Sequence, residues 1–216
     1  MNRILIASLI LILLAGCTGP DIGIGTSGSG NVVSKSFDLT GFSAIDTNSA
    51  VQVQVTHGDS YRVEVQVDDN LVSKLDVGVS GKTLHIRFQN GSYTNYTFKA
   101  LVTMPELTKV TMNGASRLDG DMAGEDLTLD LNGASRVTLT GTAGRLKIVA
   151  NGASLVQLGS LAAESVDLDA NGASRIEVNA GGAVTGRANG ASTIAVSGSP
   201  TSIDVETEGA SRVITK

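Results

Sequence analysis

The residues that usually carry catalysis or bind metals are few in this chain. Its 216 residues include two histidines, His57 and His85, and one cysteine, Cys17. Two histidines without further ligands make a poor metal site. His57 stands beside Gly58 and Asp59, a combination typical of a turn, although the sequence leaves a Ser-His-Asp arrangement open. We therefore expect a non-enzymatic protein with no catalytic residue, no metal and no cofactor.

Two carboxylates are the basis of the alternative, an enzyme that cleaves polysaccharides. Asp130 and Asp169 occupy the same position in two copies of a repeat of about 19 residues, which is described below. If each repeat is one coil of stacked β-strands, the two carboxylates lie about 9.6 Å apart, near the upper limit for an inverting glycosidase. The same row also contains Val149, Arg187 and Glu206, a mixture typical of a solvated face. We expect a lyase or hydrolase only as the lesser alternative.

Arginines form a more regular pattern. One position of the repeat holds, in turn, Arg117, Arg136, Leu155, Arg175, Thr193 and Arg212. These arginines could bind an anionic glycan or lipid headgroups, or they could pair with carboxylates of a flanking row such as Glu177. We favour pairing over binding. The arginines are nevertheless the best candidate surface for a ligand or partner, with members Arg117, Arg136, Arg175 and Arg212.

A cluster of aromatic residues adds two further candidates. Tyr93, Tyr96 and Phe98 are three of the seven aromatic residues, and they lie within six positions. Such a cluster can stack on sugars or bind a partner, and it can equally cover the open end of a β-solenoid. Both interpretations remain open at this point, and Tyr93 and Tyr96 are included in the candidate surface.

The candidate arginines and the two aspartates belong to a sequence repeat, which must position their side chains. The tetrapeptide Asn-Gly-Ala-Ser begins at Asn113, Asn132, Asn151, Asn171 and Asn189, and a variant beginning with Glu208 follows. The spacings are 19, 19, 20, 18 and 19 residues, which is too regular for chance. A fixed period with β patterning predicts a solenoid in which each repeat is one coil stacked on the previous one.

Apolar and polar residues alternate on both sides of each tetrapeptide, as in Leu146-Lys147-Ile148. This period of two predicts two strands per coil with one face inward. The tetrapeptide is expected to form a corner, where Gly adopts a positive φ and Ser faces the core. The Asn side chains are expected to stack in a structural ladder of hydrogen bonds, whose members are Asn113, Asn132, Asn151, Asn171 and Asn189. A binding role for this ladder is the alternative.

The predicted fold is therefore all-β, a parallel β-helix with coils of about 19 residues over 109–216. We expect right-handed coils, because the hexapeptide pattern of left-handed β-helices is absent. Residues 31–108 are expected to form a β region with antiparallel hairpins. One hairpin would join 51–55 to 61–67 through the turn at Gly58, and a second would join 75–79 to 84–88 through Gly81. A further strand is expected over 98–104, and almost no helix.

The first 16 residues have the features of a secretory signal peptide. Arg3 precedes an apolar run over 4–14, which at about 1.5 Å per residue is too short to span a membrane. The segment Leu14-Ala15-Gly16-Cys17 resembles the bacterial lipobox, which implies cleavage before Cys17 and attachment to a membrane through lipidated Cys17. Thr18 follows the cysteine, and by resemblance to the lipoprotein sorting rule this implies the outer membrane in a cell that has one.

Residues 17–30 are expected to form a flexible Gly/Ser tether. The tether contains Gly23, Gly25 and Gly28 in the spacing of a dinucleotide fingerprint, but it lacks the strand, the helix and the acidic residue that the fingerprint requires. The net charge is −5, and it becomes −6 after loss of the first 16 residues, with 15 basic against 21 acidic side chains. This charge argues against a nucleic-acid partner.

The order of short motifs along the chain resembles the head GIN domain family, whose members are described as auto-transporter adhesins. The segments that carry the resemblance are Gly30 to Val33, Asp38 to Phe42, Gly58 to Tyr61, Asp68 to Leu71, Leu84 to Ile86, Met104-Pro105 and the Gly-Ala-Ser repeats. The resemblance covers essentially the whole chain after the signal peptide. It implies a β-helical fold, a lipoprotein of the cell envelope and no established catalytic residues. We expect a lipid-anchored, non-catalytic binding, adhesion or structural module, with an envelope glycan or protein as its partner.

Overall fold

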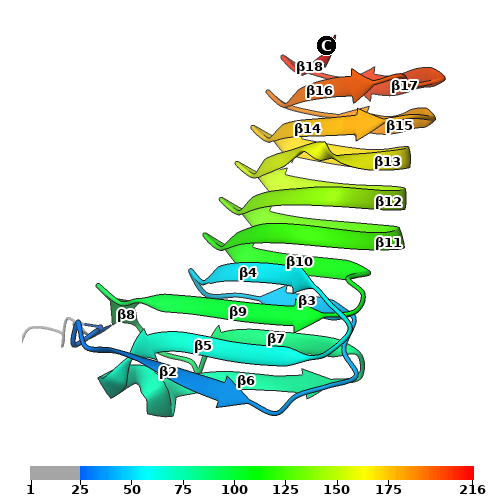
Figure 1. Ribbon diagram of the computed structural model, residues 1–216. Helices are drawn as coiled ribbons and strands as arrows, with labels where there is room; N and C mark the ends of the chain where they lie inside the picture. The colour runs from blue at the N-terminus through cyan, green and yellow to red at the C-terminus, as the bar shows by residue number, and fades with distance from the viewer. Residues whose placement is uncertain (1–24) are drawn as a thin grey trace, which may run out of the picture.

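The computed structural model describes residues 25–216, and almost every element in it is a β-strand (Figure 1). In these residues the one helical element is a short 3-10 helix, η1 (Asp69–Lys74). No helix of the described part is long and apolar enough to cross a membrane. The expected signal peptide, Cys17 and residues 18–24 lie outside the described residues.

Three long strands each wind around most of one coil. β11 (Arg117–Gly133), β12 (Arg136–Gly152) and β13 (Leu155–Gly172) pair in parallel along most of their length. Later coils are divided into shorter strands, β14 (Arg175–Ala180), β15 (Ala183–Ala188), β16 (Thr193–Gly198), β17 (Ser202–Thr207) and β18 (Arg212–Thr215). Figure 1 shows these coils stacked along one axis. The predicted parallel solenoid is confirmed, and Asn132 lies in register with Asn151, as Asn151 does with Asn171.

The core is a stack of aliphatic side chains. In β12 the alternating residues Val137, Leu139, Leu146 and Ile148 are fully buried, and their equivalents in neighbouring coils are buried with them. Over residues 140–145 of β12 only Ala143 is buried, so this short side of the coil adds one small side chain to the core. The Ser of each Asn-Gly-Ala-Ser motif in the inner coils also points inward, at Ser116, Ser135, Ser154, Ser174 and Ser192.

Each tetrapeptide forms a corner that only glycine can make easily. The glycines of the six motifs have φ between +72° and +95°, in the region that L side chains rarely adopt. Successive corners are also in close contact: a Cβ on Gly152 would lie 2.6 Å from the carbonyl oxygen of Gly133 in the preceding coil. Both the conformation and the close approach therefore require glycine at this position.

The N-terminal part extends the solenoid with a mixed layer of eight strands. Their bounds are β2 (Val32–Phe37), β3 (Ala44–Thr47), β4 (Gln52–His57), β5 (Arg62–Asp68), β6 (Leu75–Ser80), β7 (Thr83–Phe88), β9 (Phe98–Met104) and β10 (Lys109–Gly114). On one side the order is β2, β5, β9, β4 and then β11 of the solenoid; on the other side β6, β7, β3 and β10 lead to the same strand. The hydrophobic core is continuous between the two parts.

One of the two predicted hairpins is wrong. β4 and β5 do not pair with each other, because β9 lies between them, parallel to β4 and antiparallel to β5. The turn at Gly58 reverses the chain but leaves a gap that a later strand fills. The second predicted hairpin is confirmed, since β6 and β7 pair antiparallel with Ser80 opposite Thr83.

The described part of the expected tether is not a free spacer. β1 (Thr26–Ser27) pairs in parallel with β8 (Tyr93–Thr94). The side-chain oxygen of Asn70 accepts a hydrogen bond from the backbone N–H of Ser29 at 3.1 Å, and its amide donates to the carbonyl of Ser27 at 2.8 Å. Gly and Ser leave the backbone accessible, and here its polar groups are bound by the N-terminal layer.

Candidate functional site

The predicted arginine row exists as a line of side chains along the solenoid axis. Arg117, Arg136 and Arg212 each begin a strand directly after a corner serine, as does Arg175. Because the serine points inward, alternation turns the next side chain outward, and all four arginines are exposed. The pairing register places Arg117 beside Arg136, which lies beside Leu155, and continues through Arg175 and Thr193 to Arg212.

Most arginines of this row do not pair with carboxylates, although the sequence analysis favoured such pairing. Arg117 alone pairs with a carboxylate, and this hydrogen bond with Asp119 raises the pKa of its guanidinium. Among residues 25–216, Arg136, Arg175 and Arg212 form no ion pair, and Glu177 pairs with Lys216 instead. The expected pairing with a flanking carboxylate is thus wrong for three of the four arginines, whereas ligand binding by them stays a prediction. Their positive charges remain available on the surface.

Lys99 belongs to the same row, which the sequence did not indicate. Lys99 lies opposite Gln52 in the β4–β9 pair, and Gln52 lies opposite Arg117. The row from Lys99 to Arg212 therefore crosses seven strand spacings, or about 34 Å at about 4.8 Å each. We call these five cations, Lys99, Arg117, Arg136, Arg175 and Arg212, the cationic row.

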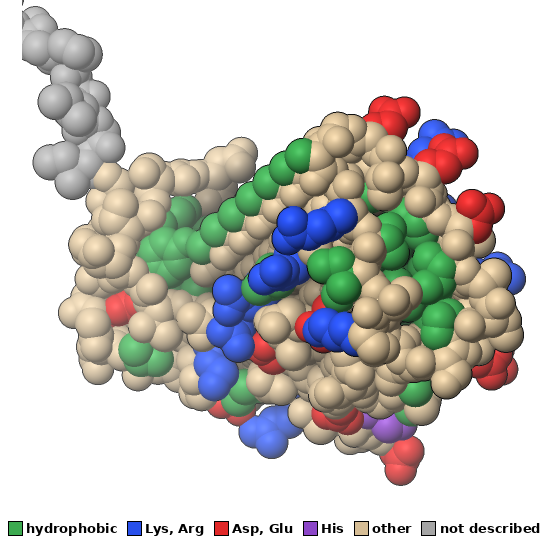
Figure 2. Space-filling model, turned by 90° about the horizontal axis from the view of Figure 1, so that it is seen from above, with side chains coloured by type: hydrophobic (Ala, Val, Ile, Leu, Met, Phe, Trp, Pro, Cys, Tyr) green, Lys and Arg blue, Asp and Glu red, His purple; other side chains and the backbone are tan. Residues whose placement is uncertain are grey.

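Two hollows accompany the cationic row. A shallow pocket of about 190 Å³ lies between Lys99 and Arg117 and is lined also by Gln52, Gln54 and Asp119. A second pocket of about 320 Å³ lies near the other end, with Arg175, Thr193 and Lys216 in its lining. Figure 2 shows Lys and Arg side chains gathered in one band beside a straight ridge of hydrophobic side chains. The exposed alanines of the repeat lie at this corner, two residues before each arginine.

The two candidate tyrosines do not join the cationic row. Tyr93 and Tyr96 pack against the ring of Phe88 with centroid distances of 4.6 and 5.2 Å, and Phe98 packs on the same ring at 4.4 Å. Burial raises the pKa of the Tyr96 phenol, against a smaller effect of a hydrogen bond from the backbone of Ala50. Both tyrosines are half-buried against the hydrophobic core. This packing fits a cover over the N-terminal layer better than a stacking platform for sugars.

The Asn side chains form a continuous chain of hydrogen bonds between coils. Each amide donates to the amide oxygen of the preceding coil, with distances of 3.2, 2.9, 3.2 and 3.0 Å from Asn132, Asn151, Asn171 and Asn189 in turn. Asn132 and Asn171 also donate to Asp130 and Asp169 of their own coils, at 3.1 and 2.9 Å. These contacts satisfy the amides within the protein and stabilise the stack of corners.

Asp130 and Asp169, the carboxylates on which the enzymatic alternative rests, accept hydrogen bonds from this ladder. Asp130 and Asp169 lie in register two coils apart, with Val149 between them, as the spacing predicted. Asp169 is exposed and Asp130 is half-buried, and neither has a carboxylate on the adjacent coil in this row. Both carboxylates act as hydrogen-bond acceptors of the ladder, which gives them a structural role.

The two histidines are far from any cluster of ligands. The backbone N–H of His57 donates to Asp121 at 3.2 Å, and Nε2 of His85 lies 3.4 Å from Oδ1 of Asp76. Within residues 25–216 no group of three or more His, Cys, Asp or Glu side chains could hold a metal ion.

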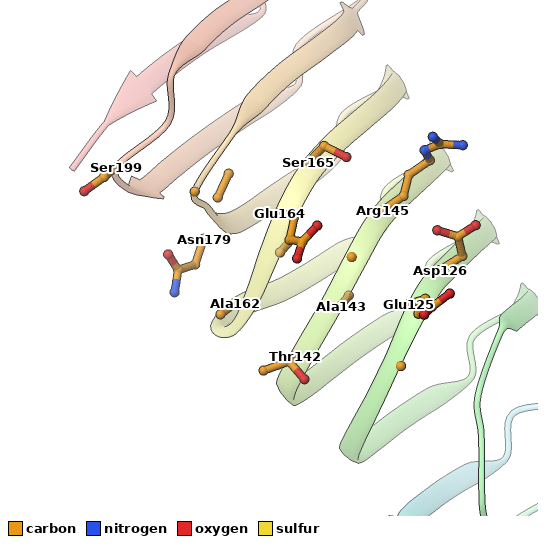
Figure 3. A pocket seen from close by; sticks show the side chains of 15 residues that line it. Glu125, Asp126, Thr142, Ala143, Arg145, Ala162, Glu164, Ser165, Asn179 and Ser199 are labelled. Carbon is orange, nitrogen blue, oxygen red and sulfur yellow. The ribbon is translucent and has the colours of Figure 1, made fainter.

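A third hollow was not indicated by the sequence. It is an open groove of about 740 Å³ along the short side of the coils, with Glu125, Asp126, Arg145 and Glu164 at its edges. Figure 3 shows that the labelled side chains come from successive coils and stand around a floor of small residues. Gly124, Ala143 and Ala163 lie in register in this floor, so the groove follows from small side chains repeated in each coil.

The comparisons with known proteins agree with this architecture. A family described as "Putative auto-transporter adhesin, head GIN domain" matches residues 41–200. The chain belongs to the head GIN domain family. No curated protein sequence matches it.

Solved structures share the fold of this head GIN domain protein at low sequence identity. A protein described as a putative adhesin from Bacteroides fragilis has a TM-score of 0.70 at 18% identity, covering 89% of this chain and all of its own. A second putative adhesin, from Parabacteroides merdae, has a TM-score of 0.54 at 14% identity, with 88% and 98% covered. A protein from Parabacteroides distasonis described as a putative lipid binding protein has a TM-score of 0.51 at 18% identity, with 88% and 98% covered.

Proposed function

We propose that this head GIN domain protein is a lipid-anchored, non-catalytic binding module of the cell envelope, and that its cationic row binds an anionic envelope glycan. The family description supports a role in adhesion at the cell surface or envelope. The lipobox-like segment before Cys17 supports anchoring through that residue. A single acyl chain holds a protein only marginally, so stable anchoring requires the several chains that lipoprotein processing adds to one cysteine.

The observation that carries the binding proposal is the line of uncompensated charge. Arg136, Arg175 and Arg212 have no ion-pair partner among the described residues, yet they share one row on a chain of net charge −5. Exposed arginines that hold no internal carboxylate are free to donate in a bidentate manner to carboxylate or phosphate groups of a ligand. A row about 34 Å long matches an extended polymer with repeated negative charges better than a small anion.

The proposed anchoring also favours a polymer over lipid headgroups. Only residues 18–25 separate Cys17 from Thr26, where β1 is bound to the N-terminal layer. This segment can span at most about 30 Å when fully extended, so the N-terminal layer must stay close to the membrane. The cationic row runs along the solenoid axis toward the other end, so a solenoid that stands upright on the membrane brings only its first members near the lipid surface. A glycan strand could lie along all of it.

Retention on immobilised anionic envelope glycan tests the binding proposal. The double variant Arg136→Gln/Arg175→Gln removes two free cations of the row, and we expect about fivefold weaker binding, from two contacts of about 0.5 kcal/mol each. The control is Lys109→Gln/Lys147→Gln, which removes the same charge from exposed positions on another side of the coils. Equal loss in both variants, or no loss in either, would contradict a specific role of the row.

Anchoring is tested separately. The wild-type chain should incorporate labelled fatty acid and fractionate with membranes, whereas Cys17→Ser should incorporate none and appear as soluble protein or as unprocessed precursor. A wild-type chain that takes up no label would overturn the anchor but not the binding proposal.

A further inference from the structure

The two ends of the solenoid differ in how their cores are covered. At the N-terminal end Leu71 of η1 is fully buried and closes the interior. At the other end the last inward residues, Ile203, Val205 and Val213, are only partly buried. Within residues 25–216 no strand pairs with the outer edges of β17 and β18, nor with those of β2 and β6 at the N-terminal end, so the two ends differ in the cover over the core and not in their edges. Such an end presents unpaired backbone groups together with apolar surface, which stacked repeats normally cover.

The two terminal strands carry opposite charges. The outward side chains of β17 include Asp204 and Glu206, both exposed, and Glu206 lies 3.7 Å from the guanidinium of Arg187 in the preceding coil. β18 begins at Arg212 and is followed directly by Lys216, which also pairs with Glu177 of the same copy. The two strands run in opposite directions on the two sides of the last coil (Figure 1). The end of the solenoid is therefore a pair of antiparallel edges, one acidic and one basic.

We propose that this end binds a second copy of the chain, with β17 of each copy paired antiparallel to β18 of the other. A two-fold axis parallel to the strands, between the two sides of the coil, produces this arrangement. In each pair of strands, the outward side chains of both copies then lie on the same face. Val213 of one copy therefore packs beside Ile203 and Val205 of the other, and the two hydrophobic cores become continuous. It also places Asp204 and Glu206 of one copy beside Arg212 and Lys216 of the other.

The charges distinguish this pairing from the other two-fold arrangement. In that arrangement β17 would pair with β17 of the partner, so that carboxylates would face carboxylates. β18 would likewise pair with β18, so that Arg212 and Lys216 would face the same two cations of the second copy. Like charges directly opposite each other destabilise a strand pair, whereas opposite charges stabilise it. A closed two-fold interface of this kind also ends the stack, because neither copy keeps a free edge at the joint.

Sedimentation velocity of the full chain in a mild detergent, over a range of protein concentrations, tests the proposal. We expect the wild type to sediment as a dimer. Asp204→Lys/Glu206→Lys makes both edges basic, and Arg212→Glu/Lys216→Glu makes both acidic, so each variant alone should dimerise at least about tenfold more weakly. An equimolar mixture of the two variants should form heterodimers, because every contact then pairs opposite charges.

The chain offers a matched control. Asp167 occupies the same register as Asp204, two coils earlier, and Glu164 precedes it on β13; both are exposed and lie within the stack, away from its last edge. Glu164→Lys/Asp167→Lys should sediment like the wild type, and circular dichroism should show the same β content in all variants. A monomeric wild type at all concentrations would overturn the proposal, as would a dimer that both edge variants leave unchanged.

Discussion

Two adjacent aspartates, Asp68 and Asp69, bind residues 29–31, which directly precede β2. The carboxylate of Asp68 is buried and accepts hydrogen bonds from the backbone N–H groups of Gly30 and Thr97, both at 2.6 Å. The carboxylate of Asp69 accepts from the Ser29 hydroxyl at 2.6 Å and from the Asn31 amide at 2.8 Å. A segment whose composition is that of a flexible linker is thereby fixed to the body of the protein.

This contact predicts a pH dependence. The hydrogen bonds from Ser29, and then from Asn31, lower the pKa of Asp69 below its ordinary value of 3.8. A lowered pKa means that the carboxylate stabilises the bound segment above pH 3.8 and that this contribution is lost as the pH falls through the lowered value. The NMR signal of the Asn31 side-chain amide should report release with a midpoint below 3.8. A midpoint above that value, or an unchanged transition in Asp69→Asn, would contradict the assignment.

At the scale of the coil, the corner is the element that sets the repeat. Its glycine takes the positive φ, its serine fills the core and its asparagine bonds to the neighbouring coil. The carbonyl of Gly133 accepts the N–H of Ala153 at 2.8 Å, so each corner is also tied to the next through the backbone. The period of about 19 residues follows because each corner must lie directly over the last.

Gly152→Ala should therefore destabilise the protein by about 2 kcal/mol or more, since it adds left-handed strain to a close backbone contact. Gly159→Ala is the control, because its Cβ would meet only the flexible side chain of Glu177, at 3.3 Å, and its φ lies outside the left-handed region. We expect it to change the free energy of unfolding by less than about 0.5 kcal/mol. Urea unfolding of both variants checks this, and equal losses would contradict the role of the corner.

The repeat explains why the solenoid could be predicted and the N-terminal layer only in part. A recurring Asn-Gly-Ala-Ser fixes register between coils, so the row of Arg117, Arg136, Arg175 and Arg212 follows from counting. Lys99 lies outside the repeat and joins the row only through the pairing of β9 with β4. The failed hairpin has the same origin: local turn chemistry predicts a reversal at Gly58, but not that a strand 30 or more residues later enters the gap.

The ion-pair partners of the charged side chains also could not be predicted from the sequence. The choice between Glu177 pairing with an arginine or with Lys216 depends on which side chain the end of the chain brings near. The aromatic cluster shows the same limit, since the packing of Tyr93 and Tyr96 on Phe88 depends on how the loop folds back.

At the scale of the whole molecule, the features are arranged along one axis. The N-terminal layer carries the bound segment and the closed core, the cationic row follows the coils, and the last coil has open edges. Together the two proposals place the anchors at opposite ends of a dimer, so that two lipid-anchored copies would connect two surfaces. Such an arrangement gives the adhesin description of the family a physical form.

The central claim is that the cations act as one row on one polymer, and affinity for a length series of linear anionic oligosaccharides tests it most directly. Each added sugar unit should contact a further cation as an intramolecular event, without a second loss of translational freedom. Affinity should therefore rise with length until the oligomer spans about 34 Å and then level off. In Arg136→Gln/Arg175→Gln the rise should be shallower. A shortest oligomer that binds as tightly as the longest, or a double variant with the length dependence of the wild type, would contradict the account.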